Sequence, residues 1–287
     1  MNDFIMLIRA KQYIKNLIIF APLFFSFSFY NLLNVLTTVL AFIAFSLAAS
    51  GVYIINDIYD IKEDQNHPEK KMRPIASGIV KVEYAWIISV LLLCISAIMS
   101  YMLNHIFLII VLGYIIINIF YSIWLKHVSI LDIVIIAIGF ILRVLAGGIV
   151  CGIYISMWII LMTFLLAIFL GLAKRREDVV LFESGHNTRK NINGYNLEFV
   201  NAAMVLMGAV IIVSYILYTV SQEVQNKFNS THLYLTSFFV ILGILRYMQI
   251  TFVGKNSGNP TILLYTDKSL QIIIILWIIT FYLIVTI

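Results

Sequence analysis

Three aspartates near residue 60 carry the strongest chemical signal in this sequence. Asp57, Asp60 and Asp64 are spaced i, i+3 and i+7, so on a helix they share one face about two turns long. They follow a long apolar run, where carboxylates are unfavourable unless a positive charge lies against them. Mg²⁺ prefers oxygen ligands and is commonly shared between one or two carboxylates and substrate phosphates. The spacing therefore predicts a Mg²⁺ site at a membrane surface, with all three aspartates as metal ligands and catalytic residues.

Basic residues follow the aspartates closely. Lys70 and Arg73 are expected to bind the phosphate oxygens that the metal leaves open. A proline directly after His67 and another after Arg73 predict turns, because proline disfavours helix in the residue before it. The alternative for each residue taken alone is a solvated helix end or an ordinary positive loop. The aspartates and the basic residues together favour metal and phosphate binding.

A second group of charges lies at 174–178, where a later apolar run ends. Lys174, Arg175 and Asp178 are candidates for a second metal or for the far end of a phosphorylated substrate. The alternative is that these positively charged residues only determine the orientation of a membrane helix. Arg189 follows downstream and is expected to close over the substrate.

Arg143 lies inside an apolar run, FILRVLAGG, where a charge should face a partner or a polar cavity. Asp132 stands eleven residues earlier, about three helical turns away, and so lies on the same helical face. We expect Arg143 to meet an acid or a phosphate, the alternative being a side chain that extends to the membrane interface. Tyr121 and Lys126, at the end of the preceding run, complete the polar set.

The elements that position these residues are expected to be membrane-spanning helices. Of the 287 residues, 62% are hydrophobic and 11% charged, which excludes a soluble globular domain. The net charge of +5 comes with no basic run long enough to follow a nucleic acid. Apolar runs of about 18–25 residues mark spanning helices. We predict one all-α membrane domain over 1–287 with nine spans: 17–34, 36–56, 84–103, 105–124, 129–150, 154–173, 198–221, 233–253 and 269–287.

The placement of lysine and arginine predicts the orientation. With a cytoplasmic N-terminus, sixteen of the nineteen fall on the inner side, all except Arg143, Lys227 and Arg246. Positive loops stay cytoplasmic, so the two long loops near 57–83 and 174–197 are expected there. The active site then faces the cytoplasm, in the inner membrane of a prokaryote.

The motif ND-x-x-D-x-x-x-D at 56–64 resembles the UbiA superfamily of intramembrane prenyltransferases. Its longer form, continuing to HP-x-K-x-x-RPIASG, is similar to the decaprenyl-phosphate phosphoribosyltransferase branch. The opening RAKQYIKNLIIFAPL, the LRVLAGG around Arg143 and the AKRRED at 173–178 fit the same branch. Prenyl-transferring members usually carry a paired aspartate motif in the second loop, whereas this chain has Glu177 and Asp178 side by side.

The resemblance implies a helical bundle with a central cavity open to the cytoplasm. It also implies Mg²⁺-dependent transfer of a 5-phosphoribosyl group from phosphoribosyl pyrophosphate to a polyprenyl phosphate. Asn56 and the three aspartates would hold Mg²⁺ and the donor diphosphate. The full set of expected substrate-binding residues is Lys15, Asn16, Asn56, His67, Lys70, Arg73, Tyr121, Lys126, Arg143, Lys174, Arg175, Asp178 and Arg189.

Two alternatives stay open. A UbiA-type prenyltransferase would use the same metal motif to move a polyprenyl group from its diphosphate to an aromatic acceptor such as 4-hydroxybenzoate. A cation-coupled transporter would use the acidic row to bind a transported ion, although the acids lie at one face rather than along a path. We expect no nucleic-acid partner, and a homo-oligomer is compatible with the sequence.

Overall fold

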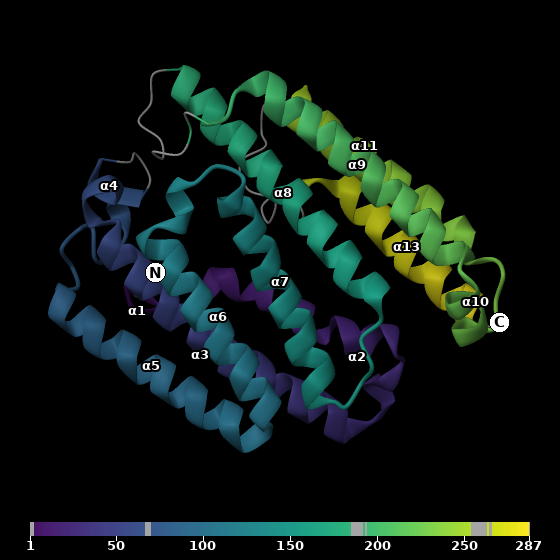
Figure 1. Ribbon diagram of the computed structural model, residues 1–287, viewed down its shortest axis with the longest axis horizontal. Coiled ribbons are helices and arrows are strands. Elements are labelled where there is room, and N and C mark those ends of the chain that lie inside the picture. The colour runs from purple at the N-terminus through teal and green to yellow at the C-terminus, as the bar shows by residue number, and fades with distance from the viewer. Residues whose placement is uncertain are drawn as a thin grey trace. The chain divides into compact units, whose positions relative to one another are not determined.

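The computed structural model describes residues 3–66, 70–184, 192, 194–253, 263 and 266–286. These residues form helices and connecting turns, with no β-strand among them, so the expected all-α class is confirmed (Figure 1). The chain divides into two compact units, Met1–Ile160 and Leu161–Ile287. The single domain and the central cavity open to the cytoplasm stay predictions.

The first unit is organised around one long helix, α3. Its elements are α1 (Asp3–Leu7), η1 (Ala10–Phe20), α2 (Ala21–Phe25), η2 (Ser28–Tyr30), α3 (Leu32–Tyr59), α4 (Ile61–Gln65), η3 (Lys70–Met72), α5 (Val82–Leu103), α6 (His105–Ile123), η4 (Leu125–His127) and α7 (Leu131–Val150). Helix α3 packs against α5, α6, α7 and η1. Small residues on α3, such as Ala44 and Gly51, allow this close approach, and their carbonyls accept hydrogen bonds from Ser96 and Ser89 of α5 at 2.7 and 2.8 Å.

The second unit holds α8 (Met157–Glu183), α9 (Leu197–Val220), α10 (Gln222–Phe228), η6 (Leu233–Thr236), α11 (Ser237–Phe252) and α13 (Lys268–Thr286), with the start of α8 falling in the first unit. Helix α11 packs against α9 and α13. The Tyr215 hydroxyl on α9 accepts a hydrogen bond from Trp277 of α13 and bonds Thr236 of η6, both at 2.8 Å. These contacts satisfy polar groups in an otherwise apolar interior.

Eight helices of the described chain are long and apolar enough to cross a membrane, and the predicted count of nine is not confirmed. The expected first span, 17–34, is not one continuous α-helix. It lies across η1, α2 and η2, with Phe27 at φ +54° between the last two. Pro22 stands in the first turn of α2, where its missing N–H leaves no hydrogen bond broken. The apolar composition of this segment therefore predicted a spanning helix but did not determine its helix type.

Two other boundaries differ from the prediction in ways that matter for function. Helix α3 extends to Tyr59, beyond the predicted end at residue 56. Helix α8 continues to Glu183, so the charges at 174–178 lie on the helix rather than in a loop. Strong helix formers such as Lys, Arg and Glu extend a helix past the end of its apolar run.

Candidate active site

The three aspartates lie where α3 passes into α4. Asp60 joins the two helices with φ −93° and ψ 5°. Its backbone N–H still donates to the Asn56 carbonyl at 3.0 Å, and the N–H of Asp64 donates to the Asp60 carbonyl at 2.8 Å. The helical path thus continues through the join, and all three carboxylates stay within two turns of one another.

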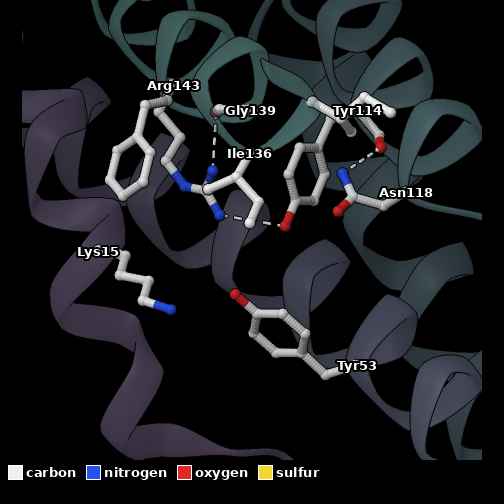
Figure 2. A pocket seen from close by; sticks show the side chains of 9 residues that line it. Lys15, Tyr53, Tyr114, Asn118, Ile136, Gly139 and Arg143 are labelled. Atoms are coloured by element: carbon white, nitrogen blue, oxygen red, sulfur yellow. Dashed lines mark hydrogen bonds between the residues drawn. The ribbon is translucent and has the colours of Figure 1, made fainter. Parts of the chain in front are cut away.

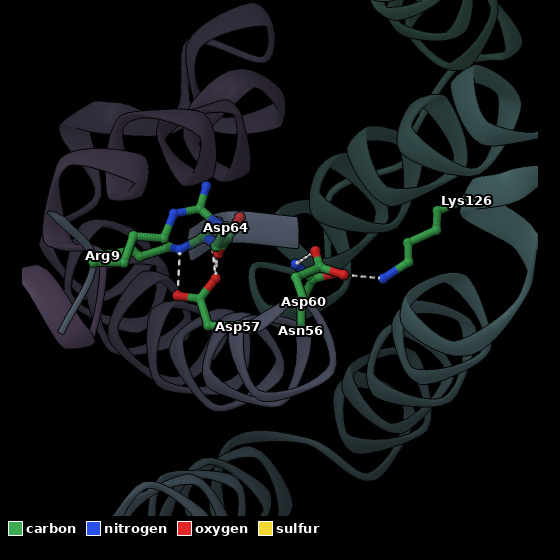
Figure 3. Close-up of polar contacts among 7 residues, drawn as sticks. Arg9, Asn56, Asp57, Asp60, Asp64 and Lys126 are labelled. Atoms are coloured by element: carbon green, nitrogen blue, oxygen red, sulfur yellow. Dashed lines mark hydrogen bonds and ion pairs between the residues drawn. The ribbon is translucent and has the colours of Figure 1, made fainter. Parts of the chain in front are cut away.

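Asp57 and Asp64 converge on the same guanidinium group. Nη1 of Arg73 lies 3.0 Å from Oδ1 of Asp57 and 2.6 Å from Oδ2 of Asp64. Arg9 forms a bidentate ion pair with Asp57, in which Nε donates to Oδ2 at 3.1 Å and Nη2 donates to Oδ1 (Figure 3). Both aspartates are 3% exposed, so these arginines supply the opposite charge that buried carboxylates require.

Asp60 turns to a different partner. Its carboxylate forms an ion pair with Lys126 of η4 and accepts a hydrogen bond of 2.8 Å from the Asn56 side-chain amide (Figure 3). On a helix, Asp60 is rotated about 60° from Asp57, whereas Asp64 is rotated by only about 20°. This rotation brings Asp60 within reach of Lys126, so the structure shows a pair of acids and a third to one side rather than one row.

A tight turn positions Arg73 at the centre of this site. The Arg73 carbonyl accepts a hydrogen bond from the Ser77 backbone N–H at 2.9 Å, and the Pro74 carbonyl accepts one from Val80 at 2.9 Å. Gly78 adopts φ +79°, a conformation that glycine reaches without steric cost. Gln65 of α4 donates to the Ala76 carbonyl at 3.2 Å and ties the turn to the aspartates.

The donor set at the end of α3 suits Mg²⁺ in chemistry, although no group of three acidic, histidine or cysteine side chains is clustered as a metal site in the described residues. Two buried carboxylate oxygens, from Asp57 and Asp64, already face one cationic nitrogen of Arg73. Burial raises the pKa of Asp64, and Arg73 counteracts that rise. Mg²⁺ commonly takes one or two carboxylates and completes its shell with phosphate and water oxygens. Asp57 and Asp64 are therefore the residues that would hold it.

A second polar site surrounds Arg143 inside the first unit. Arg143 is 4% exposed and donates from Nε to Asn16 Oδ1 at 2.7 Å, from Nη1 to the Gly139 carbonyl at 2.7 Å and from Nη2 to the Tyr114 hydroxyl at 3.1 Å (Figure 2). The Phe45 ring lies 5.1 Å from the guanidinium carbon and adds a cation–π contact.

Asp132 is not the partner of Arg143. Their separation of eleven positions corresponds to about 16 Å along α7, too far for an ion pair. Asp132 is itself fully buried in the first turn of α7. Asp132 is therefore not the acid that was expected beside Arg143, and a phosphate partner stays a prediction.

A cavity of about 60 Å³ adjoins Arg143. Its lining residues are Lys15, Tyr53, Tyr114, Asn118, Ile135, Ile136, Gly139, Phe140 and Arg143. Figure 2 shows the Tyr53 hydroxyl directed toward the guanidinium across this space and the Lys15 amine directed toward the Tyr53 hydroxyl. Lys15 and Asn16 come from η1, the 3-10 helix between α1 and α2.

Sequence reasoning missed four residues of these sites, namely Arg9, Tyr53, Tyr114 and Asn118. Tyr114 and Asn118 are polar residues one turn apart in an apolar helix, a pattern that the sequence does contain. Tyr53 stands one turn before Asp57 on α3. Arg9 carries no comparable signal, because it is forty-eight residues from its partner.

The remaining predicted residues fall into three groups. Lys70 and Tyr121 are half-buried, in η3 and at the end of α6. On α8, Lys174 is half-buried, and Arg175 is 1% exposed and pairs with Asp178. His67 and Arg189 lie outside the described residues.

Comparisons with known proteins agree with this description. Residues 17–179 match the model of the UbiA prenyltransferase family, which is more than half of the chain. The decaprenyl-phosphate phosphoribosyltransferase of Mycolicibacterium smegmatis is 32% identical over 94% of this chain and 88% of its own length. The protein of the same name from Corynebacterium glutamicum is 29% identical, over 94% and 83%.

The fold has solved counterparts as well. A UbiA homolog from Archaeoglobus fulgidus, bound to GPP and Mg²⁺, superposes with a TM-score of 0.72 at 20% identity and covers 100% of both chains. At this identity the likeness shows the fold alone. The family match and the relatives that align over nearly the whole chain show more than the fold. This chain belongs to the UbiA prenyltransferase family and is a membrane-bound transferase.

Proposed function

We propose that this transferase moves a 5-phosphoribosyl group from phosphoribosyl pyrophosphate to a polyprenyl phosphate and releases pyrophosphate. The observation that carries the proposal is the similarity, over nearly the whole chain, to relatives named decaprenyl-phosphate phosphoribosyltransferase. The family assignment removes the transporter alternative. Transfer of a polyprenyl group to an aromatic acceptor is the competing reaction.

The end of α3 suits the binding of a leaving diphosphate. Three cations, from Arg9, Arg73 and Lys126, lie within hydrogen-bonding distance of the aspartates. Breakage of the anomeric C–O bond leaves negative charge on pyrophosphate, and fixed positive groups stabilise that charge as it develops. Mg²⁺ held by Asp57 and Asp64 would act as a Lewis acid on the same oxygens.

The acceptor needs little chemical activation. A phosphate monoester is already an anion at neutral pH, so no side chain has to remove a proton from it. The role of the protein is then to hold the acceptor oxygen against the anomeric carbon and to exclude water. The surrounding spanning helices provide such a water-poor site for a lipid substrate.

We place this site on the cytoplasmic side of a prokaryotic inner membrane. The placement rests on the positive-inside bias of the sequence, since the basic residues near the aspartates belong to the same side as most other lysines and arginines. A soluble donor would then enter from the cytoplasm, and the lipid would enter from the bilayer.

The test supplies purified protein in nanodiscs with Mg²⁺, labelled phosphoribosyl pyrophosphate and a polyprenyl phosphate. We expect labelled lipid and pyrophosphate in equal amounts, with loss of turnover in Asp57→Asn. Glu63→Gln is the matched control, because Glu63 is an exposed acid next to Asp64. No labelled lipid, together with turnover of a polyprenyl diphosphate and 4-hydroxybenzoate, would replace the proposal with prenyl transfer.

A further inference from the structure

We infer that the cavity beside Arg143 binds the phosphate group of the lipid acceptor, in a site separate from the aspartate cluster that binds the donor. This inference rests on the proposed function and divides its two phosphorylated substrates between two places. Four observations support it: an unbalanced buried charge, a cavity of suitable size, its depth in the spanning helices and its position relative to the leaving group.

The charge of Arg143 is balanced by no acid in the described part of the chain. Its three hydrogen-bond partners are an amide, a backbone carbonyl and a hydroxyl, all of them neutral. A guanidinium has five N–H donors, so two remain for a ligand. A buried cation without an opposite charge is strongly unfavourable, and an anionic ligand removes that penalty.

The cavity next to these donors has the size and lining that a phosphate group requires. Its volume is about 60 Å³, compared with about 10–15 Å³ for a single water on a similar measure. Lys15 brings a second cation, and the Tyr53 hydroxyl faces the same space (Figure 2). A tetrahedral group with several oxygens fits here.

The cavity lies deeper along the helices than the aspartates do. Arg143 stands twelve residues after the start of α7, about 18 Å along the axis, and reaches back one turn to Gly139. Lys126, which pairs with Asp60, precedes that helix start. A phosphate attached to a hydrocarbon chain suits the deeper position, whereas a soluble and highly charged donor suits the helix ends.

Tyr53 separates the two sites. Its ring lies 5.2 Å from the guanidinium carbon of Arg9, which pairs with Asp57, while Tyr53 also lines the cavity of Arg143. In the transfer, an acceptor phosphate oxygen forms a bond to C1 of the ribose as the C1–O bond breaks. The electron pair of that bond leaves with pyrophosphate, and the attacking oxygen approaches from the opposite side. With pyrophosphate at Asp57, the acceptor phosphate belongs on the Tyr53 side.

The experiment measures binding of radiolabelled farnesyl phosphate, a short isoprenoid phosphate, to purified protein without donor. Arg143→Gln is expected to weaken this binding about 10- to 100-fold, the range for lost charge-assisted hydrogen bonds. Binding of phosphoribosyl pyrophosphate with Mg²⁺ should change by less than about threefold, a factor worth about 0.65 kcal/mol. Asp57→Asn should show the reverse pattern. Arg246→Gln is the matched control, because it removes an arginine of the second unit and should change neither affinity.

Competitors identify the chemistry of the bound group. Farnesol, the same chain without phosphate, should fail to displace the probe. If inorganic phosphate displaced the labelled probe at the same concentration as unlabelled farnesyl phosphate does, the cavity would be a free-phosphate site and the inference would be overturned. Displacement by 4-hydroxybenzoate at such concentrations would identify an aromatic carboxylate site and also overturn it. An Arg143→Gln variant that loses the donor instead of farnesyl phosphate would assign the cavity to the donor.

Two further variants keep the test decisive if Arg143→Gln does not fold. Lys15→Gln changes a half-buried side chain and should weaken farnesyl phosphate binding without affecting the donor. Arg143→Lys keeps the charge and should recover part of the affinity. Unchanged farnesyl phosphate affinity in both would refute the inference. A third outcome separates the two proposals. If the wild-type protein binds farnesyl phosphate through Arg143 but transfers no phosphoribosyl group, the proposed function is refuted and the phosphate site is supported.

Discussion

Gly147 is the residue whose substitution tests the packing behind the acceptor cavity. An added Cβ at Gly147 of α7 would overlap the Ile19 carbonyl oxygen and lie 2.8 Å from the carbonyl carbon. These are backbone atoms of η1, so no side-chain rotation relieves the clash. The segment that must move carries Lys15 and Asn16, which face Arg143. Gly147→Ala should therefore destabilise the protein and weaken the phosphate site together.

The size of the effect follows from a matched control. Gly113 of α6 has no atom within 4 Å of an added Cβ. Both substitutions gain about 1 kcal/mol of helix propensity, so the difference between them isolates the clash. Overpacking typically costs about 1–3 kcal/mol, and a rigid backbone neighbour favours the upper end.

Thermal unfolding in nanodiscs and farnesyl phosphate binding measure the two consequences. For a chain of this size we expect Gly147→Ala to unfold several degrees below Gly113→Ala, at about 2–4 °C for each kcal/mol. The affinity for farnesyl phosphate should fall in Gly147→Ala alone. Equal midpoints and equal affinities in the two variants would show that η1 does not press against α7 at this point, and the positioning argument for Lys15 would fail.

Three other substitutions probe the rest of the first site and one contact of the second unit. Arg9→Gln should weaken binding of the donor with Mg²⁺ about tenfold or more, measured by equilibrium binding, because it removes one of the three cations beside the aspartates that would contact the diphosphate. Gly78→Ala should lower stability by about 1–2 kcal/mol in chemical unfolding, since φ is +79° there and no atom opposes the added Cβ. Arg246→Gln should lower the melting temperature slightly. The Arg246 hydrogen bond lowers the pKa of Asp267, so this difference should be full above about pH 4 and disappear as the pH falls through the lowered pKa.

The sequence was most informative where chemistry and local spacing coincide. The three aspartates and Arg143 stand out because a charge next to or inside an apolar run requires a compensating partner. Asp57, Asp64 and Arg143 are indeed buried and make several polar contacts, whereas Asp60 is half-buried. The different partners of the three aspartates were not predictable from the sequence. Asp60 contacts Lys126, which is sixty-six residues away.

Hydropathy could not predict that η1, α2 and η2 replace one continuous spanning helix. The run after residue 17 is apolar enough for a span, yet Asn16 is 1% exposed and donates to Ser46 at 2.9 Å while accepting from Arg143. Such a buried amide is satisfied only by partners from other helices, and these partners draw η1 into the unit. Pairings over long sequence separations decide the local structure here, and single-sequence periodicity contains no record of them.

The balance of charge at the end of α3 suggests how the donor and its metal enter together. Three carboxylates face three cations, so the cluster is close to neutral before any ligand binds. A metal ion alone would displace Arg73 from Asp57 and Asp64 and leave several positive groups close together, which is unfavourable in a buried site. A diphosphate alone would face the carboxylates. A metal–diphosphate complex avoids both repulsions, because the metal meets the aspartates while the displaced cations meet phosphate oxygens. The same arrangement leaves Arg143, which lines one cavity with Tyr53, as a buried cation of the first unit that is available to the second anionic substrate.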